Sequence, residues 1–323
     1  NQAGYNTQGR DAIAIGNDAA FFSQGQRSVA IGYQAGRLTQ GSGAVAIGYQ
    51  AGYNTQGNNT VAIGNQAGQT NQSGNTVAIG TAAGRNTQGS GAIAIGFTAG
   101  QATQGTFSIA IGHLAAAWVQ GSQSIAIGYN TANTNQGGQS IAIGAQSGQT
   151  FQQNVAIAIG VQAGQGTQGS YSIAMGAFAG NSGQASQSIA IGYQAGFQNQ
   201  STGGNYSVAI GSLAGQSNQG YQSIALGVNS GQTAQGTQSV AVGFQVAQYA
   251  QGQNAVALGS NSGQGSQGNN GIAIGYQAGY TNQSGLAVSI GSFAGNSSQG
   301  SYGVAIGRQA GQTTQGTQSV AIG

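Results

Sequence analysis

Residues 45–60 read VAIGYQAGYNTQGNNT, and this stretch is one copy of a repeat that fills the chain of 323 residues. We number the positions of the repeat as columns 1 to 16, with Val45 in column 1 and Thr60 in column 16. Column 4 is glycine in every copy, and its successive copies lie 16 residues apart, except that the interval from Gly192 to Gly211 is 19. A fixed short period is typical of solenoid proteins, in which each repeat forms one coil.

The first columns of the repeat predict a β-strand. Column 1 is Val or Ile in every copy, column 3 is Ile or a similar residue, and column 2 is Ala except at Ser289. Alternation with a period of two is typical of strands, and the glycine of column 4 ends the strand. A second short strand is expected through columns 5–9, as in Tyr49–Tyr53. The sequence therefore predicts an all-β fold, a parallel β-solenoid (β roll) of twenty 16-residue coils with two short strands per coil.

The two faces of the first strand suggest an inside and an outside. We expect columns 1 and 3 to fill the coil interior as a core ladder that includes Val29, Ile31, Val45, Ile47, Val61 and Ile63. Column 2 then faces outward, and its uniform Ala predicts a smooth stripe at which chains associate side by side. This interface stripe includes Ala30, Ala46, Ala62, Ala78 and Ala94. The alternative is that both faces are buried within one chain.

Column 12 is glutamine in every copy beside variable neighbours. Identical amides stacked along a solenoid can bond to one another, as in the amide ladders of cross-β structures. We therefore expect an amide ladder that includes Gln24, Gln40, Gln56, Gln72 and Gln88. The simpler alternative is that these side chains are solvated turn residues.

The repeat predicts a single continuous array over residues 1–323. The three-residue insertion lies between Phe197 and Tyr206, around Thr202–Gly204, and is expected to form a bulged turn that leaves the stack in register. The first and last residues lie in phase within the repeat, so we expect the array to be a block of a longer fibre, or a unit that stacks end to end.

The composition excludes several classes of function. Only 2% of residues are charged, and the five arginines are scattered, so no basic face for nucleic acid is expected. No apolar run approaches the ~18 residues of a membrane span, so no membrane insertion is expected. Two Asp, one His and no Cys, Lys or Glu leave no acid–base pair and no metal-ligand set. We expect no enzyme activity and no cofactor.

Two local features indicate candidate contacts. Residues 113–119 hold the only His and the only Trp, which favours either a surface bump or a receptor contact. Aromatic residues also recur in column 5, where they could bind a surface glycan by stacking or shield the core at a corner. This row includes Tyr33, Tyr49, Phe97, Tyr129, Tyr193, Phe244 and Tyr276.

The motif Ser-Val-Ala-Ile-Gly, at residues 28–32, 188–192 (with Ile in place of Val) and 319–323, resembles the head repeats of YadA-type trimeric autotransporter adhesins. The same motif also resembles repeats in phage and virus tail-fibre proteins. The resemblance covers essentially the whole chain. It implies a left-handed parallel β roll that assembles as a homotrimer and displays a sticky shaft away from a cell or virion.

We therefore expect an extracellular structural or adhesive fibre, on a cell or virion surface or as a secreted filament, whose main partner is the chain itself. Two alternatives remain open. One is an ice- or glycan-binding solenoid that uses the Thr residues of column 11, such as Thr39, Thr55, Thr87 and Thr103. The other is a filament subunit that grows by head-to-tail stacking of coils.

Overall fold

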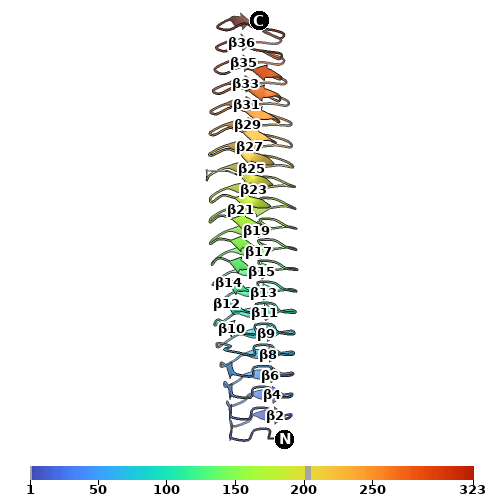
Figure 1. Ribbon diagram of the computed structural model, residues 1–323, viewed down its shortest axis with the longest axis vertical. Coiled ribbons are helices and arrows are strands. Elements are labelled where there is room, and N and C mark those ends of the chain that lie inside the picture. The colour runs from blue at the N-terminus through green and yellow to red at the C-terminus, as the bar shows by residue number, and fades with distance from the viewer. Residues whose placement is uncertain (1, 201–204) are drawn as a thin grey trace. The chain divides into compact units, whose positions relative to one another are not determined.

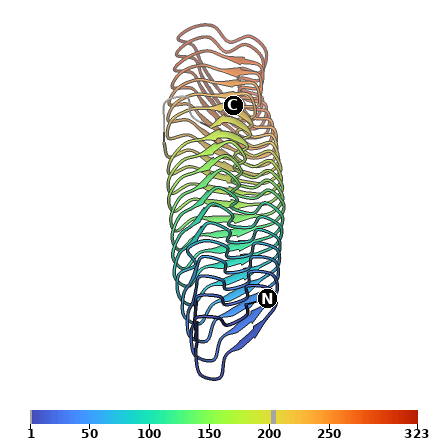
Figure 2. The same cartoon turned by 60° about the horizontal axis from the view of Figure 1, so that its bottom comes forward.

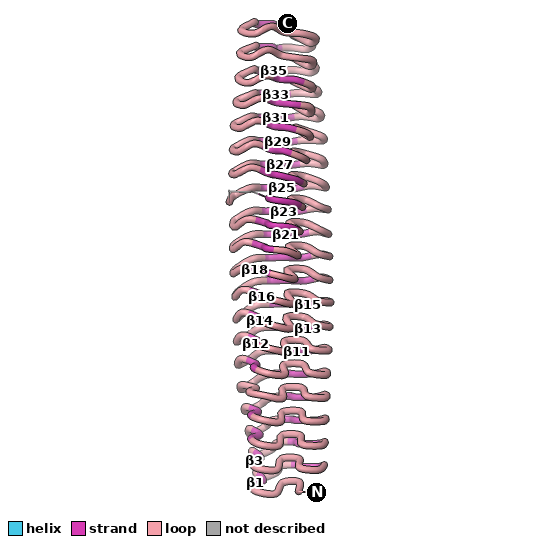
Figure 3. Tube along the Cα trace, viewed as in Figure 1, coloured by secondary structure: helices cyan, strands magenta, loops and turns pink. Residues whose placement is uncertain are grey.

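The computed structural model describes residues 2–200 and 205–323, which form two compact units, Asn1–Val161 (unit 1) and Gln162–Gly323 (unit 2). In both described stretches the regular elements are short strands, joined by turns, and no helix is present (Figure 3). Within each unit the strands stack one above another in successive coils of the 16-residue repeat (Figure 1). The predicted all-β parallel solenoid is therefore confirmed. Its left-handed sense stays a prediction.

Columns 1–3 form one sheet in each unit, here called the front sheet. Each strand pairs in parallel with the strand one coil away, so that Val45 lies opposite Val61 and Ile47 opposite Ile63. In unit 1 the strands are β2 (Ile13–Ile15), β4 (Val29–Ile31), β6 (Val45–Ile47), β8 (Val61–Ile63), β9 (Val77–Ile79), β11 (Ile93–Ile95), β13 (Ile109–Ile111), β15 (Ile125–Ile127), β17 (Ile141–Ile143) and β19 (Ile157–Ile159). In unit 2 they are β21 (Ile173–Met175), β23 (Ile189–Ile191), β25 (Val208–Ile210), β27 (Ile224–Leu226), β29 (Val240–Val242), β31 (Val256–Leu258), β33 (Ile272–Ile274), β35 (Val288–Ile290), β36 (Val304–Ile306) and β37 (Val320–Ile322).

Columns 11 and 12 form the back sheet of each unit. In unit 1 its strands are β1 (Thr7–Gln8), β3 (Ser23–Gln24), β5 (Thr39–Gln40), β7 (Thr55–Gln56), β10 (Thr87–Gln88), β12 (Thr103–Gln104), β14 (Val119–Gln120), β16 (Asn135–Gln136) and β18 (Phe151–Gln152). In unit 2 they are β20 (Thr167–Gln168), β22 (Ser182–Gln184), β24 (Gln198–Gln200), β26 (Ser217–Gln219), β28 (Ala234–Gln235), β30 (Ala250–Gln251), β32 (Ser266–Gln267) and β34 (Asn282–Gln283). Single parallel bridges continue the sheet at Gln72, Gln299 and Gln315.

The expected position of the second strand, columns 5–9, is wrong. These columns form turns, because columns 6 and 8 take left-handed backbone conformations that a strand does not contain. In the coil of residues 45–60, φ is 52° at Gln50 and 54° at Gly52, and the strand begins only at Thr55. The chain reverses direction through these turns and enters the back sheet, which gives the closed outline of the coils seen in Figure 2.

The expected inside and outside of the front strand are reversed. The predicted interface stripe, Ala30, Ala46, Ala62, Ala78 and Ala94, is fully buried, with no exposed surface. The predicted core ladder, Val29, Ile31, Val45, Ile47, Val61 and Ile63, lies on the outer face and is only half-buried. Because successive side chains of a strand point to opposite faces, assigning the wrong face inverts both predictions together.

The interior of the coil is too narrow for branched side chains. Column-2 alanines pack against the alanines of column 7 in one buried cluster, as Ala46 and Ala51 do in unit 1. A methyl group built on Gly84 in column 8 would lie 3.3 Å from Cβ of Ala78 and 2.9 Å from Oε1 of Gln88. The space between the two sheets therefore holds alanine methyl groups, glycine backbone and glutamine amides, while valine and isoleucine remain outside.

Register is kept on both sides of the insertion in unit 2. Strand β23 pairs with β25, with Ile189 opposite Val208, although three more residues separate them than in other coils. Residues 201–204 lie outside the described residues. The bulged turn predicted around Thr202–Gly204 falls among them. That residues 1–323 form one continuous array stays a prediction.

Candidate association surface

The outer surface of the front sheet is a regular apolar face. It consists of the side chains of columns 1 and 3, two from each strand, which are Val or Ile except at Met175, Leu226 and Leu258. The small residue of column 2, Ala in every strand but β35, separates them along the strand. Away from the end strands β2 and β37, exposure within the sheets reaches 36% at Ile79 and 41% at Leu226. The main chain beneath is hydrogen-bonded between coils, as in the 2.9 Å bond from Val61 N to Thr76 O. We call this surface the front face.

The column-12 glutamines lie inside the coil and brace its two sheets. Nε2 of Gln40 donates to the carbonyl of Val29 at 2.7 Å, and Nε2 of Gln56 donates to that of Val45 at 2.8 Å. Each bond connects the back sheet to the first residue of the front strand in the same coil. These side chains are therefore buried cross-braces, and the alternative of a solvated turn residue is wrong.

The predicted amide ladder along the axis is present at some steps. Among the five glutamines named for it, Gln72 donates to Oε1 of Gln88 at 3.1 Å. In unit 2, Gln283 donates to Gln299 and Gln299 to Gln315, each at 3.2 Å. The amide nitrogens of Gln24, Gln40 and Gln56 bond to main-chain carbonyls across the coil. Bonding across the coil is thus the more general role of this column.

A second set of amide rows, not predicted, lies on the outer corner formed by columns 6 and 9. In unit 2 it is one chain of bonds of 2.9–3.0 Å, each donor one coil beyond its acceptor, through Gln264, Gln248, Gln232, Gln216 and Gln194. In unit 1, Gln66 and Gln50 donate in the same way to Gln50 and Gln34. The recurrence of Gln in columns 6 and 9 is the sequence signal that could have indicated these rows.

Aromatic side chains in column 5 stack on one another along the axis. Tyr33 and Tyr49 have ring centroids 5.4 Å apart and an interplanar angle of 8°. The rings of Phe97, His113 and Tyr129 form a stack of three, with centroid distances of 5.2 and 5.3 Å. Stacked rings cover one another's faces and leave their edges outward, whereas sugars bind to ring faces. This geometry disfavours the glycan-stacking interpretation at these five side chains.

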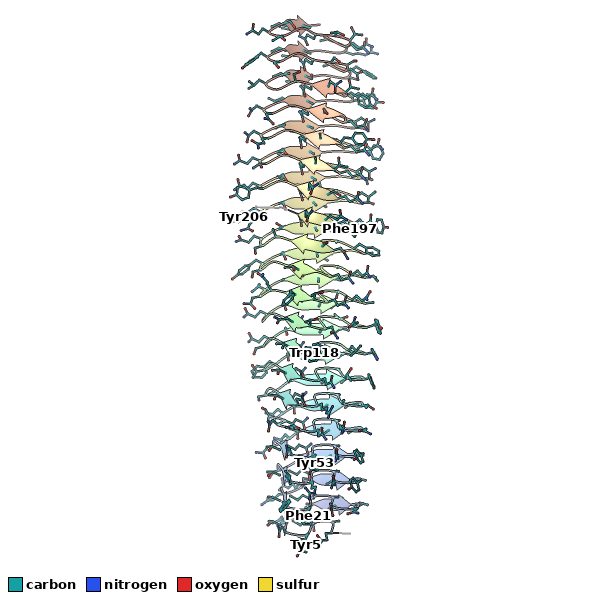
Figure 4. All side chains as sticks on the ribbon, viewed as in Figure 1. Tyr5, Phe21, Tyr53, Trp118, Phe197 and Tyr206 are labelled. Carbon is teal, nitrogen blue, oxygen red and sulfur yellow. The ribbon has the colours of Figure 1, made fainter. Side chains whose placement is uncertain are left out.

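Column 9 of unit 1 carries a cation–π cluster at its first coils. Tyr5 stacks on Phe21 at 5.3 Å, and the guanidinium of Arg37 lies 5.5 Å from the ring centroids of both Phe21 and Tyr53. Arg37 also donates to the hydroxyl of Tyr53 at 2.9 Å. Tyr5, Phe21 and Tyr53 are labelled one above another in Figure 4. This cluster gives Arg37 a structural role.

The coil with the unusual composition, residues 109–124, keeps the normal interior. Ala115 and Ala116 are buried, His113 belongs to the column-5 stack, and Trp118 is 63% exposed (Figure 4). Val119 and, two coils later, Phe151 add exposed apolar surface to the back sheet beside it. The large side chains thus form a bump on the surface and do not enlarge the core.

The described residues contain no group of three His, Cys, Asp or Glu that could hold a metal ion. Their one ion pair, Arg10 with Asp11 at 3.3 Å, is exposed. Two shallow polar depressions of about 350 and 230 Å³ are lined by amides, hydroxyls, backbone and one guanidinium, that of Arg27. The part of the chain that the structure describes contains no helix long and apolar enough to cross a membrane.

Comparison with known proteins points to one family. The family model described as YadA head domain repeat (2 copies) matches residues 40–67, 104–131, 219–245 and 249–262. These segments lie in both units, and each includes at least one front strand. No curated protein sequence and no solved structure matches the chain. The chain is thus a β-solenoid whose repeats are similar to those of an adhesin head.

Proposed function

We propose that this protein is an extracellular structural or adhesive fibre whose chains associate side by side through the front face, as a homotrimer. The proposal places it on a cell or virion surface or in a secreted filament, without enzyme activity. Two findings support it. The repeats are similar to those of YadA heads, whose family is surface-exposed and trimeric in general, and the front face is apolar in every coil.

The single observation that carries the proposal is the outward position of columns 1 and 3. Complete burial of an Ile or Val side chain is worth about 1.5–3 kcal/mol, so covering the exposed part of each contributes about 0.5 kcal/mol. Twenty such side chains per unit give on the order of 10 kcal/mol, comparable with the cost of association. Burial along the whole face can therefore offset the cost of association, whereas a contact of a few coils cannot.

Adhesion would use the surfaces that remain outside such an assembly. These are the back sheet and the turns at its border, which carry amide rows, hydroxyl groups and the exposed Trp118. Their polar, nearly uncharged character fits a surface glycan or host receptor bound through hydrogen bonds and apolar contacts, and it gives no basic surface for nucleic acid. We propose that Trp118 and Val119 form one site of contact with such a glycan or receptor. The stacked rings of column 5 are not proposed as a glycan-binding site.

Ice or glycan binding by the threonines of column 11 is a second candidate. Thr39 and Thr55 are exposed neighbours in the back sheet, as are Thr87 and Thr103. Ser23, Asn71 and Val119 interrupt this row, so no more than two successive coils carry Thr. Thermal hysteresis in dilute solution of the wild-type protein is the measurement that would favour this candidate.

The association is tested by sedimentation and light scattering over a range of concentrations. We expect a mass that is a multiple of 31.6 kDa for the wild-type protein. Replacing Ile47, Ile63 and Ile95 by Thr should shift the equilibrium to the monomer, since three apolar positions of the front face become polar. The matched control replaces Val119, Phe151 and Trp118 by Thr on the other side and should keep the assembly. A wild-type monomer at every concentration would refute the proposal.

A further inference from the structure

We propose that the aromatic row of column 5 in unit 1 sets the axial register between associated copies of this chain. This inference rests on the proposed function, because it concerns a second copy lying on the front face. It adds a specificity determinant to that interface: the apolar face gives attraction, and the neighbouring row decides which coil meets which.

The front face by itself carries little information about register. Column 3 of unit 1 presents Ile in every coil, so a copy displaced by one coil meets the same side chains again. Column 1 changes only twice along the unit, from Ile13 in β2 to Val29 in β4 and from Val77 in β9 to Ile93 in β11. Such a displacement loses only the contacts of one coil at each end. Strands with uniform faces are weakly specified in register and prone to slippage.

Column 5 is the aperiodic row beside this face. In unit 1 two rings, Tyr33 and Tyr49, are followed by two small polar residues and then by the three rings Phe97, His113 and Tyr129. A pattern of two rings, a gap and three rings does not repeat when it is displaced by one coil. The row can therefore distinguish the correct alignment from its neighbours, which columns 1 and 3 cannot.

The position of the row brings it into any contact made by the front face. Column 5 follows column 3 across one glycine, so its side chains lie at the border of the face. Phe97 and Tyr129 are 51% and 56% exposed, although each ring is stacked on His113. The rings of each stack are nearly parallel and form one continuous block along the axis. A second copy that covers Ile95 and Ile111 must fit against this block or leave a gap beside it.

The chain contains no cysteine, so introduced cysteines report register without background. One reporter is Ile63→Cys, whose disulfide forms where equal coils meet and is lost when the copies are displaced by two or more coils. The second is a mixture of chains carrying Ile47→Cys or Ile79→Cys. These positions are two coils apart, about 10 Å along the axis, which exceeds the ~7 Å limit for Cα atoms joined by a disulfide. The mixed disulfide therefore forms only between displaced copies.

The test variant replaces five side chains of column 5 by Thr, which this column already carries at residue 81. They are Tyr33, Tyr49, Phe97, His113 and Tyr129. The control variant is the triple back-sheet substitution of Trp118, Val119 and Phe151 by Thr. We expect the test variant to keep the mass of the wild-type assembly, to lose about two-fold or more of the equal-coil disulfide, and to form the mixed disulfide. The control should match the wild type in all three measurements.

Retention of the exclusive equal-coil disulfide by the test variant would overturn the inference while leaving the proposed function intact. A wild-type protein that remains monomeric would overturn both. If the test variant does not fold by circular dichroism, a chain in which only Phe97, His113 and Tyr129 are replaced by Thr takes its place. This chain should form the mixed disulfide of Ile47→Cys and Ile79→Cys, which copies in register cannot form. Absence of that product would refute the inference.

Discussion

Enlarging one alanine of column 2 should destabilise the protein far more than altering the isoleucine next to it. Ala94 has no exposed surface, and its Cβ lies 3.4 Å from the position that a methyl group on Gly100 would occupy. Oε1 of Gln104 would lie 2.8 Å from the same position. The two additional carbons of Ala94→Val have no free space, so the two sheets must separate locally. Overpacking of this kind costs about 1–3 kcal/mol.

The neighbouring substitution Ile95→Thr tests the other face. The side chain of Ile95 lies outside and is half-buried, so its replacement should cost the isolated chain less than about 1 kcal/mol. If column 3 filled the interior instead, placing a hydroxyl there would cost more than this, because it would be buried without a partner. If column 2 is buried, Ala94→Val should lower the stability more than Ile95→Thr. If column 3 were buried, Ile95→Thr should lower it more.

The assay is denaturation in guanidinium chloride, followed by circular dichroism and by the fluorescence of Trp118, which lies one coil beyond Ala94 and is the only Trp in the chain. Measurements at low and high protein concentration separate folding from association, because association stabilises the wild type more as concentration rises, and a variant that weakens association gains less of this stability. We expect Ala94→Val to lower the midpoint at every concentration and Ile95→Thr to do so mainly at high concentration. Equal midpoints for Ala94→Val and the wild type would refute the buried position of column 2.

Three further predictions follow from single contacts. Gln104→Leu should cost about 1–3 kcal/mol in the same denaturation assay, because it removes the 2.6 Å bond from Nε2 to the carbonyl of Ile93, whereas Gln123→Leu on the exposed corner should have little effect. Arg37→Gln should lower the free energy of unfolding by about 1 kcal/mol through loss of three cation–π contacts, and an unchanged midpoint would show that the cluster does not contribute. Thermal stability should be the same in 0.05 and 1 M sodium chloride within about 1 °C, because the ion pair of Arg10 is exposed; a melting temperature that falls with salt would contradict this.

The architecture could be predicted from the sequence because the repeat determines where strands and turns fall. Alternation in columns 1–3 and glycine in column 4 predict a strand of three residues followed by a turn, and β6 has these bounds. Gly48 has φ of 127°, and a methyl group there would lie 2.6 Å from the carbonyl oxygen of Gly64 in the next coil. Column 4 therefore requires glycine for both its conformation and the close approach of the next coil. Parallel stacking at one coil per repeat follows from the period.

The orientation of the front strand was not predictable from alternation alone. A period of two defines two faces but does not say which one is inside, and the preference of large apolar residues for the interior led to the wrong choice. The relevant signal was the size of three columns taken together. Ala46, Ala51 and Gly52 occupy columns 2, 7 and 8, and this combination of small residues is what a narrow interior requires. The location of the second strand failed for another reason, since nothing in Gln50 itself indicates a left-handed conformation.

The reversed orientation leaves the single chain with a small core. Its interior consists of alanine methyl groups and glutamine amides, and alanine contributes little apolar area per residue. The larger apolar side chains, two per front strand, remain partly in water in the single chain. Hydrogen bonds between coils maintain the solenoid, as in the bond from Gly64 N to the carbonyl of Ile47 at 2.8 Å, but their net contribution is modest. Covering the front face with further copies would therefore complete the burial that one coil is too thin to provide, and stability and assembly should rise together with protein concentration.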